Sequence, residues 1–184
     1  MRIISGEKRG FRLARIKRGL IRPTSDRTKE LIFNVLRDQV KNSVVLDIFA
    51  GSGSLGIEAL SRGALRAIFI DNNQQAIKIL LKNLTMTQFQ DRAEILNNLA
   101  TKALRRLAHS KSQFSVIFAD PPYKTSLAEE TLNTIDTSSF LVKDGWFILE
   151  HHFKQRFPKT KHLTLETVKQ QGETSVSFFR HAKR

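Results

Sequence analysis

The chain has 184 residues, enough for one domain with a sizeable core, and its 40% hydrophobic and 26% charged content is typical of a globular protein. The absence of cysteine excludes disulfide bonds, thiol catalysis and cysteine-type zinc sites. With 31 Lys and Arg against 17 Asp and Glu, the formal charge is +14, so we expect a polyanionic partner, with nucleic acid as the first choice.

The first fifth of the chain carries half of this charge excess. Residues 1–40 contain 11 basic and 4 acidic residues, a net +7. Short alternating pieces punctuated by glycines predict a hairpin or an extended arm at the start. Apolar residues then recur at helical spacing, which predicts a helix capped by Thr24, Ser25 or Asp26. We therefore distinguish a basic N-terminal extension from a more neutral body over 41–184.

Beyond residue 40, predicted strands and helices alternate. The expected strands are 43–49, 66–72, 93–97, 114–120 and 145–152, and the expected helices are 53–63, 74–86, 99–108 and 126–135. Segments 161–170 and 174–180 flank the turn signal Gly172-Glu173 and predict a closing antiparallel hairpin. This order is typical of an α/β fold with a mostly parallel sheet and helices on both faces.

A glycine-rich loop follows the first predicted strand, in LDIFAGSGSLG. Its glycines let the backbone turn sharply and approach a ligand closely. Asp47 precedes the glycines, and Asp71 ends the next strand, where an acid can accept hydrogen bonds from ribose hydroxyls. An acid before the loop repels a pyrophosphate but can pair with an ammonium group. The pattern therefore favours S-adenosylmethionine over a dinucleotide.

The tetrapeptide Asp120-Pro121-Pro122-Tyr123 ends the strand predicted over 114–120. Two adjacent prolines fix φ at two residues and restrict the residue before each, so this turn is rigid. Ligands of parallel sheets bind at the carboxyl ends of the strands. We therefore expect the tetrapeptide and the glycine-rich loop to face the same ligand site.

Together, the loop and the tetrapeptide resemble the motifs of S-adenosylmethionine-dependent methyltransferases that modify exocyclic amino groups of nucleobases. The chain also carries MRIISG…RG, IRPTSDR and LDIFAGSGSLGIEALSRGA before FADPPY. In this order and at these distances, they resemble the RsmD family of bacterial small-subunit rRNA guanine-N2 methyltransferases, over essentially the whole chain. The resemblance implies a Rossmann-like class I methyltransferase domain over 41–184, with a seven-stranded sheet, and an RNA-binding extension over 1–40.

The resemblance also assigns roles to individual residues. It implies catalytic roles for Asp120, Pro121 and Tyr123; S-adenosylmethionine binding by Asp47, Gly51, Ser52, Gly53, Asp71 and Asn98; and RNA binding by Arg2, Arg9, Arg22, Thr24, Arg27 and Tyr123. Leu99 stands where relatives tend to have Asp or Asn beside the adenine ring. A shift of one residue would let its neighbour Asn98 make that contact instead. Phe11 stands where relatives favour a basic residue.

The implied reaction is methyl transfer to the exocyclic N2 of a specific guanine in 16S rRNA, with S-adenosylhomocysteine as product and no metal. The implied partner is 16S rRNA within a small ribosomal subunit or an assembly intermediate. No segment approaches 18 apolar residues and the N-terminus has no apolar run of signal-peptide length, so we expect a cytoplasmic protein with no membrane partner, acting as a monomer.

Two alternatives remain open from the residues alone. The same tetrapeptide serves transfer to adenine N6 in DNA or RNA, because the chemistry at the amine is shared. A chain with this fold could also be a non-catalytic RNA-binding assembly factor, although the presence of Asp47, Asp71 and Asp120 argues against it.

Overall fold

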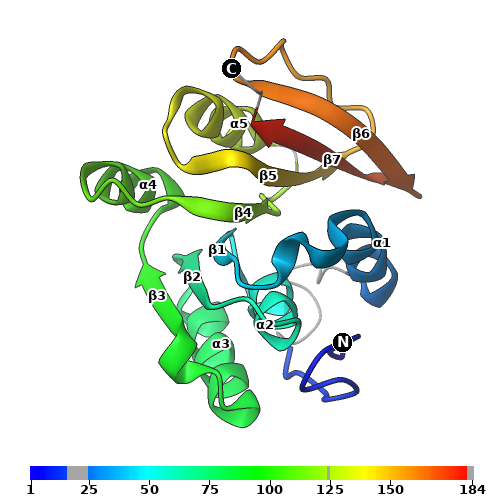
Figure 1. Ribbon diagram of the computed structural model, residues 1–184, viewed down its shortest axis with the longest axis vertical. Coiled ribbons are helices and arrows are strands. Elements are labelled where there is room, and N and C mark those ends of the chain that lie inside the picture. The colour runs from blue at the N-terminus through cyan, green and yellow to red at the C-terminus, as the bar shows by residue number, and fades with distance from the viewer. Residues whose placement is uncertain (16–24, 124, 182–184) are drawn as a thin grey trace.

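The centre of the molecule is a seven-stranded sheet with the strand order β3-β2-β1-β4-β5-β7-β6 (Figure 1). The computed structural model describes residues 1–15, 25–123 and 125–181. The strands are β1 (Val44–Ile48), β2 (Arg66–Asp71), β3 (Ala93–Asn97), β4 (Phe114–Ala119), β5 (Leu141–His152), β6 (Leu163–Gln171) and β7 (Thr174–His181). Strands β1 to β5 run parallel, whereas β7 pairs antiparallel with both β5 and β6. The predicted fold class, including the closing hairpin, is confirmed.

The main difference from the predicted elements lies in β5, which begins at Leu141 instead of residue 145. Leu141 pairs with Phe114, and the register then shifts so that Trp146 pairs with Val116. The extra residues of β5 between these pairs form a bulge, which contains Asp144 at φ 61°. A bulge inserts residues without ending the strand, and the turn signal of Asp144-Gly145 concealed this extension in the sequence.

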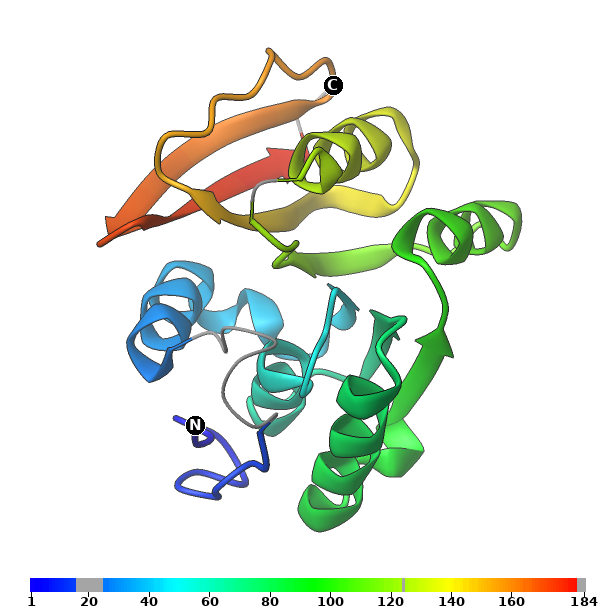
Figure 2. The ribbon, with the colours of Figure 1, turned by 180° about the vertical axis from the view of Figure 1, so that it is seen from behind.

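Helices cover both faces of the sheet (Figure 2). They are α1 (Asp26–Leu36), α2 (Ser54–Ser61), α3 (Gln74–Thr87), α4 (Ala100–His109) and α5 (Leu127–Thr137), with short 3-10 turns η1 (Arg37–Val40) and η2 (Gln90–Arg92). Alternate residues of a strand point to opposite faces. Accordingly, Val45 and Phe69 pack with α1, α2 and α3 in one apolar cluster, while Leu46 and Ile68 pack with α4 and α5 in another.

Helix α1 starts where the sequence offered three capping residues. Ser25 is the N-cap, and its hydroxyl oxygen accepts a hydrogen bond from the Thr28 amide at 3.0 Å. The α-helix ends at Leu36, because Arg37 has φ 45° and the chain tightens into η1. The helix buries Ile32, Phe33 and Leu36 in the core, whereas Leu31 and Val35, which also belong to its predicted apolar positions, are only half-buried.

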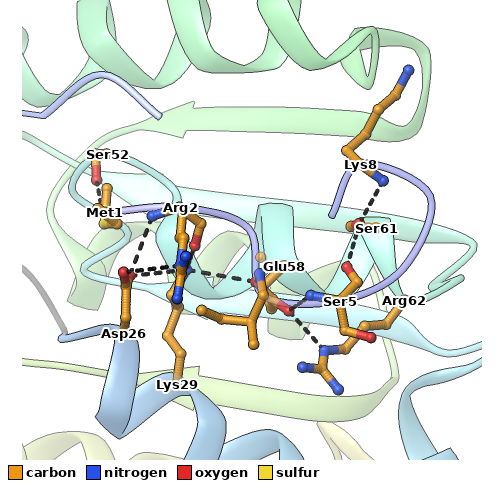
Figure 3. Close-up of polar contacts among 12 residues, drawn as sticks. Met1, Arg2, Ser5, Lys8, Asp26, Lys29, Ser52, Glu58, Ser61 and Arg62 are labelled. Atoms are coloured by element: carbon orange, nitrogen blue, oxygen red, sulfur yellow. Dashed lines mark hydrogen bonds and ion pairs between the residues drawn. The ribbon is translucent and has the colours of Figure 1, made fainter. Parts of the chain in front are cut away.

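The first residues of the chain lie against α2. Arg2 and Arg12 form an antiparallel bridge, and Ile3 and Leu13 are buried in the cluster shared with α1, α2 and α3. The turn of this hairpin meets the end of α2: the Glu7 amide donates to the Ser61 carbonyl at 2.8 Å. Side chains of α1 and α2 also bind this segment, as the close-up in Figure 3 shows. The N-terminal hairpin is therefore packed onto the body of the protein.

None of the helices in the described part of the chain has the length and apolar character needed to cross a membrane.

Candidate active site

A cavity of about 600 Å³ opens at the carboxyl ends of the parallel strands. Side chains of a parallel sheet's loops meet at this edge, which is where ligands of such sheets bind. The loops after β1, β2, β3 and β4 all contribute to its wall, as does β5. The lining residues that matter below are Arg15, Phe49, Gly51, Ser52, Asp71, Asn98, Leu99, Asp120, Pro121, Pro122, Tyr123 and Glu150. The two motifs singled out in the sequence therefore share one cavity.

The glycine-rich loop forms one wall. Gly53 precedes α2 as its N-cap at φ +80°, a left-handed conformation that favours glycine, and a Cβ there would also displace Leu80 Cδ1, 2.3 Å away. Gly51 has φ +57°, and a Cβ there would meet nothing closer than 4.0 Å, which leaves bare backbone beside the cavity. Phe49 adopts φ 63°, a strained conformation for an aromatic residue, at the start of the same turn.

Asp71 supports this loop from the end of β2. Its Oδ2 accepts a hydrogen bond from the Gly51 amide at 2.7 Å, and its Oδ1 accepts one from the Asn73 amide at 2.8 Å. A carboxylate has about four lone-pair sites, so further acceptor capacity remains on both oxygens. Because Asp71 also lines the cavity, it can hold the loop and accept hydrogen bonds from a ligand's hydroxyls.

Asp47 lies behind the loop and outside the cavity lining. Its side chain is buried, and its Oδ2 accepts a hydrogen bond from the Gly56 amide at 2.9 Å. Burial raises the pKa of Asp47 to about 7, with smaller contributions in the same direction from the Asp120 and Asp71 charges. In this arrangement Asp47 joins β1 to α2, and its pairing with a ligand's ammonium group stays a prediction.

The Asp-Pro-Pro-Tyr tetrapeptide forms the opposite wall. The Asp120 amide donates to the Ile48 carbonyl at 3.4 Å, which ties the start of the turn to the end of β1. Pro121 is buried and Pro122 exposed. Thr125 Oγ1 donates to the Pro122 carbonyl at 2.8 Å and closes the turn on its far side. The rigid turn expected from the sequence thus has its first and third residues fixed by hydrogen bonds.

Tyr123 is anchored through its hydroxyl. The hydroxyl lies 3.2 Å from Glu150 Oε1 and 2.7 Å from Thr174 Oγ1. The ring makes an edge contact with His152 at a centroid distance of 6.2 Å. Burial raises the pKa of Tyr123 to about 12, so the phenol stays neutral and can donate to Glu150. The antiparallel part of the sheet therefore fixes the orientation of this ring at the cavity wall.

The loop after β3 contributes both Asn98 and Leu99 to the cavity. The Asn98 amide donates to the Asp71 carbonyl at 3.0 Å, and Asn98 Oδ1 accepts from the Leu99 amide at 2.9 Å. Leu99 is 47% exposed. An exposed leucine in the cavity wall can pack against an apolar or aromatic ligand surface, next to the polar Asn98.

The predicted RNA-binding residues fall into three places. Arg22 and Thr24 lie outside the described residues. Arg2 and Arg27 lie near the start of α1, where Arg2 Nε is 3.8 Å from Asp26 Oδ2. Arg9 lies in the hairpin turn that contacts the carboxyl end of α2, and so at the opposite end of that helix from the cavity.

Two charged residues among those described in the cavity wall were missed in the sequence. Glu150 is buried within β5, and the signal for it was an acid inside the apolar run WFILEHH. Arg15 lines the cavity from the N-terminal hairpin, and among so many basic residues nothing distinguished it. Within the described ranges, no group of three or more His, Asp or Glu side chains could hold a metal ion.

Comparisons with known proteins extend these observations. The family model described as conserved hypothetical protein 95 matches residues 1–180. A candidate rRNA methyltransferase, YlbH of Bacillus subtilis, is 38% identical over 181 residues and 98% of each chain. Ribosomal RNA small subunit methyltransferase D of Escherichia coli is 35% identical over 86% of this chain and 78% of its own length. The solved structure of a candidate methyltransferase, yhhF of Escherichia coli, superposes with a TM-score of 0.86 at 30% identity, over 98% of this chain and 97% of its own.

Proposed function

Because this chain belongs to the RsmD family, we propose that it transfers a methyl group from S-adenosylmethionine to the exocyclic N2 of a guanine in 16S rRNA. The observation that carries the proposal is the cavity itself. A glycine-rich loop supported by Asp71 and the Asp-Pro-Pro-Tyr turn face each other across it. The wall with Asp71 can accept hydrogen bonds from the hydroxyls of a nucleoside, and the wall formed by the tetrapeptide can accept hydrogen bonds from an amine.

The residues present fit S-adenosylmethionine. The cavity volume lies within the range of about 300–1,000 Å³ found for small-molecule sites. Asp71 would accept hydrogen bonds from the ribose hydroxyls, and the bare backbone at Gly51 and Ser52 would admit the amino acid tail. Asn98 would lie beside the polar edge of the adenine ring, and Leu99 would pack against its apolar face. Bound there, S-adenosylmethionine supplies an electrophilic sulfonium methyl group.

Asp120 and Pro121 would act on the attacking amine. The lone pair of guanine N2 is delocalised into the ring, so the nitrogen must pyramidalise to become nucleophilic. The Asp120 carboxylate and the Pro121 carbonyl can each accept a hydrogen bond from an N2 hydrogen and favour that geometry. The new C–N bond forms as the C–S bond breaks, and the surplus N2 proton, acidic only after transfer, passes to water. Asp120 therefore need not be a strong base.

Tyr123 would stack on the target base. A base must leave its own stack to enter such a cavity, and base–aromatic stacking contributes roughly 1–3 kcal/mol. The hydroxyl contacts to Glu150 and Thr174 support this role, because they hold the ring in one orientation before substrate arrives.

The basic N-terminal extension would supply RNA affinity. We propose that residues 1–40 form this extension and 41–184 the catalytic domain, with Arg2, Arg9, Arg22, Thr24 and Arg27 on RNA. The charge of +14 supports a polyanionic substrate. The name of the Escherichia coli relative supports the small subunit, and we propose 16S rRNA within that subunit or an assembly intermediate. We further propose that the protein acts as a cytoplasmic monomer.

The test is tritium transfer from labelled S-adenosylmethionine to small ribosomal subunits that lack this modification. Wild-type protein should transfer label, and Asp120→Ala should lose at least about 100-fold of the rate. The exposed acid Asp38 in η1 offers a matched control as Asp38→Ala. Undiminished transfer by Asp120→Ala would overturn the catalytic assignment. Firm rRNA binding without S-adenosylmethionine binding would instead indicate a non-catalytic assembly factor.

A further inference from the structure

A second hollow, of about 430 Å³, lies between α1 and the end of β6. We call it the α1–β6 groove. In Figures 1 and 2, α1 lies beside the end of the β6–β7 hairpin, and a hydrogen bond of 3.2 Å from Thr28 Oγ1 to Gln171 Oε1 joins the two. The residues that line the groove are Arg27, Glu30, Leu31, Asn34, Val35, Lys169, Gln170 and Gln171.

The groove combines cationic, amide and apolar side chains, the groups that contact the phosphates and bases of a nucleic acid. Arg27 and Lys169 are exposed, one on each wall, and neither has an ion pair among residues 1–15, 25–123 and 125–181. Asn34 and Gln170 add exposed amides that can donate and accept hydrogen bonds. Leu31 and Val35 are half-buried and give the groove an apolar floor. Glu30 is the single acid among the described residues of the lining.

The groove adjoins the active-site cavity through the β6–β7 hairpin. Gln171 of the groove pairs directly across the hairpin with Thr174. Thr174 Oγ1 lies 2.7 Å from the Tyr123 hydroxyl in the cavity wall. Residues directly opposite in an antiparallel pair have Cβ atoms about 4.5–5.5 Å apart. The groove therefore lies next to the part of the cavity wall that holds Tyr123, where an RNA strand leaving the cavity past this end of the hairpin would meet it.

We propose that the α1–β6 groove binds the RNA strand that flanks the target guanosine. Arg27 and Lys169 contact phosphates from opposite walls, the amides of Asn34 and Gln170 contact sugars or base edges, and a flanking base rests on Leu31 and Val35. This proposal rests on the proposed function, and it adds β6 to the RNA-binding surface expected from the N-terminal extension. RNA is favoured over an acidic protein because amides and a small apolar floor accompany the cations.

The experiment measures the affinity of unmodified 16S rRNA at several salt concentrations between 50 and 200 mM. Lys169→Ala and Arg27→Ala should each lower the slope of log K against log salt by about 0.7–0.9, as expected for one lost phosphate contact. Lys41→Ala is the matched control. Lys41 is exposed and precedes β1, so it lies at the amino ends of the parallel strands, opposite the cavity. S-adenosylmethionine affinity, measured by calorimetry, should not change in any variant, which also shows that each variant is folded.

The outcomes separate the two proposals. Wild-type protein that neither binds nor methylates rRNA would overturn the proposed function and the groove with it. Wild-type protein that does both, with slopes for Lys169→Ala and Arg27→Ala equal to that of Lys41→Ala, would overturn the groove alone. If the variants lose activity on assembled subunits but keep their affinity for naked rRNA, the groove contacts a ribosomal protein, and the assignment to RNA is wrong.

Discussion

Lys29 and Glu58 form an ion pair in which neither side chain is exposed to solvent, with Nζ and Oε2 3.5 Å apart. Glu58 also accepts hydrogen bonds from the Ile4 and Ser5 amides at 2.8 and 3.0 Å and from Arg62 Nε at 2.8 Å (Figure 3). Lys29 Nζ donates to the Arg2 carbonyl. A buried ion pair between α1 and α2 thus binds the backbone of the N-terminal hairpin, whose last described residue, Arg15, lines the cavity.

Replacing Glu58 with Gln should destabilise the protein strongly. The variant would leave the buried Lys29 ammonium with only the more distant Asp26 carboxylate, at 4.0 Å, and removing one partner of a buried pair typically costs about 3–5 kcal/mol. Burial already lowers the pKa of Lys29, against the opposing effect of Glu58. Urea unfolding measures the change in free energy, with the exposed Glu30→Gln on α1 as control. A loss within about 1 kcal/mol of that control would show that the Lys29–Glu58 pair contributes no more to stability than a surface ion pair does.

Two glycines of the N-terminal hairpin provide a matched pair of variants. Gly6 and Gly10 have almost the same φ, +85° and +84°. A Cβ at Gly6 would lie 1.8 Å from the Ser61 carbonyl oxygen, whereas a Cβ at Gly10 would meet nothing within 4 Å. Gly10→Ala should therefore cost only the left-handed backbone strain, about 1–2 kcal/mol. Gly6→Ala should cost more and displace the hairpin from α2.

Functional assays of the same pair test the role of the docked hairpin. Gly6→Ala should weaken rRNA binding more than Gly10→Ala does, because the basic hairpin loses its fixed position. Equal rRNA affinity for the two variants would contradict a role for the docked hairpin in RNA binding.

Asp47 should make the stability of the protein depend on pH. The pKa of Asp47 is about 7 in the folded protein against an ordinary value of 3.8, so between these two pH values the folded state holds an extra proton. The resulting stabilisation is complete below about pH 4 and is lost as the pH rises through about 7, a change on the order of 4 kcal/mol. In Asp47→Asn this dependence should disappear.

The measurement is urea unfolding of wild type and Asp47→Asn from pH 4 to pH 8, with Asp38→Asn as an exposed control. The difference in unfolding free energy between wild type and Asp47→Asn should fall from pH 4 to about pH 7 and be flat between pH 7 and pH 8. A difference that does not vary with pH would mean that Asp47 is ionised throughout. S-adenosylmethionine titrations of Asp47→Asn would show in addition whether Asp47 also pairs with the ammonium group.

The ring and the hydroxyl of Tyr123 can be separated by substitution. Tyr123→Ala removes the stacking surface and should raise KM for rRNA about 5- to 150-fold, equivalent to roughly 1–3 kcal/mol. Tyr123→Phe keeps the ring and loses only the contacts to Glu150 and Thr174, so we expect KM for rRNA to rise by less than about 10-fold. Steady-state kinetics with saturating S-adenosylmethionine distinguishes these effects. A Phe variant as impaired as the Ala variant would show that the hydroxyl, and not the ring, is the essential group.

The sequence predicted the sheet because its signals are local. Short β-branched runs alternate with helical periodicity, and Gly172-Glu173 marks the closing turn, so the strand types and the final hairpin followed. The bulge after Leu141 did not, because a turn signal at Asp144-Gly145 looks the same whether it ends a strand or interrupts one. The loop and the tetrapeptide were expected at one cavity because carboxyl ends of parallel strands share an edge.

Side-chain partners were much harder to predict. Lys29 precedes the apolar stripe of α1 and has the sequence signature of an exposed lysine, yet it is fully buried, because Glu58 lies opposite it on a helix that begins 25 residues later. Glu150 meets Tyr123 because β5 pairs with β4, the strand that leads into the tetrapeptide, and Thr174 of β7 shares the contact with the Tyr123 hydroxyl. These contacts depend on tertiary packing between segments far apart in the chain, which single-sequence patterns do not encode.

The most direct test of the central claim is the identity of the methylated nucleoside. Purified protein is incubated with S-adenosylmethionine and unmodified small ribosomal subunits, and the 16S rRNA is digested to nucleosides for mass spectrometry. We predict one new product, N2-methylguanosine, that is absent when Asp120→Ala replaces the wild type. The appearance of N6-methyladenosine would contradict the account, and so would the absence of any new methylated nucleoside when the protein is folded and binds S-adenosylmethionine.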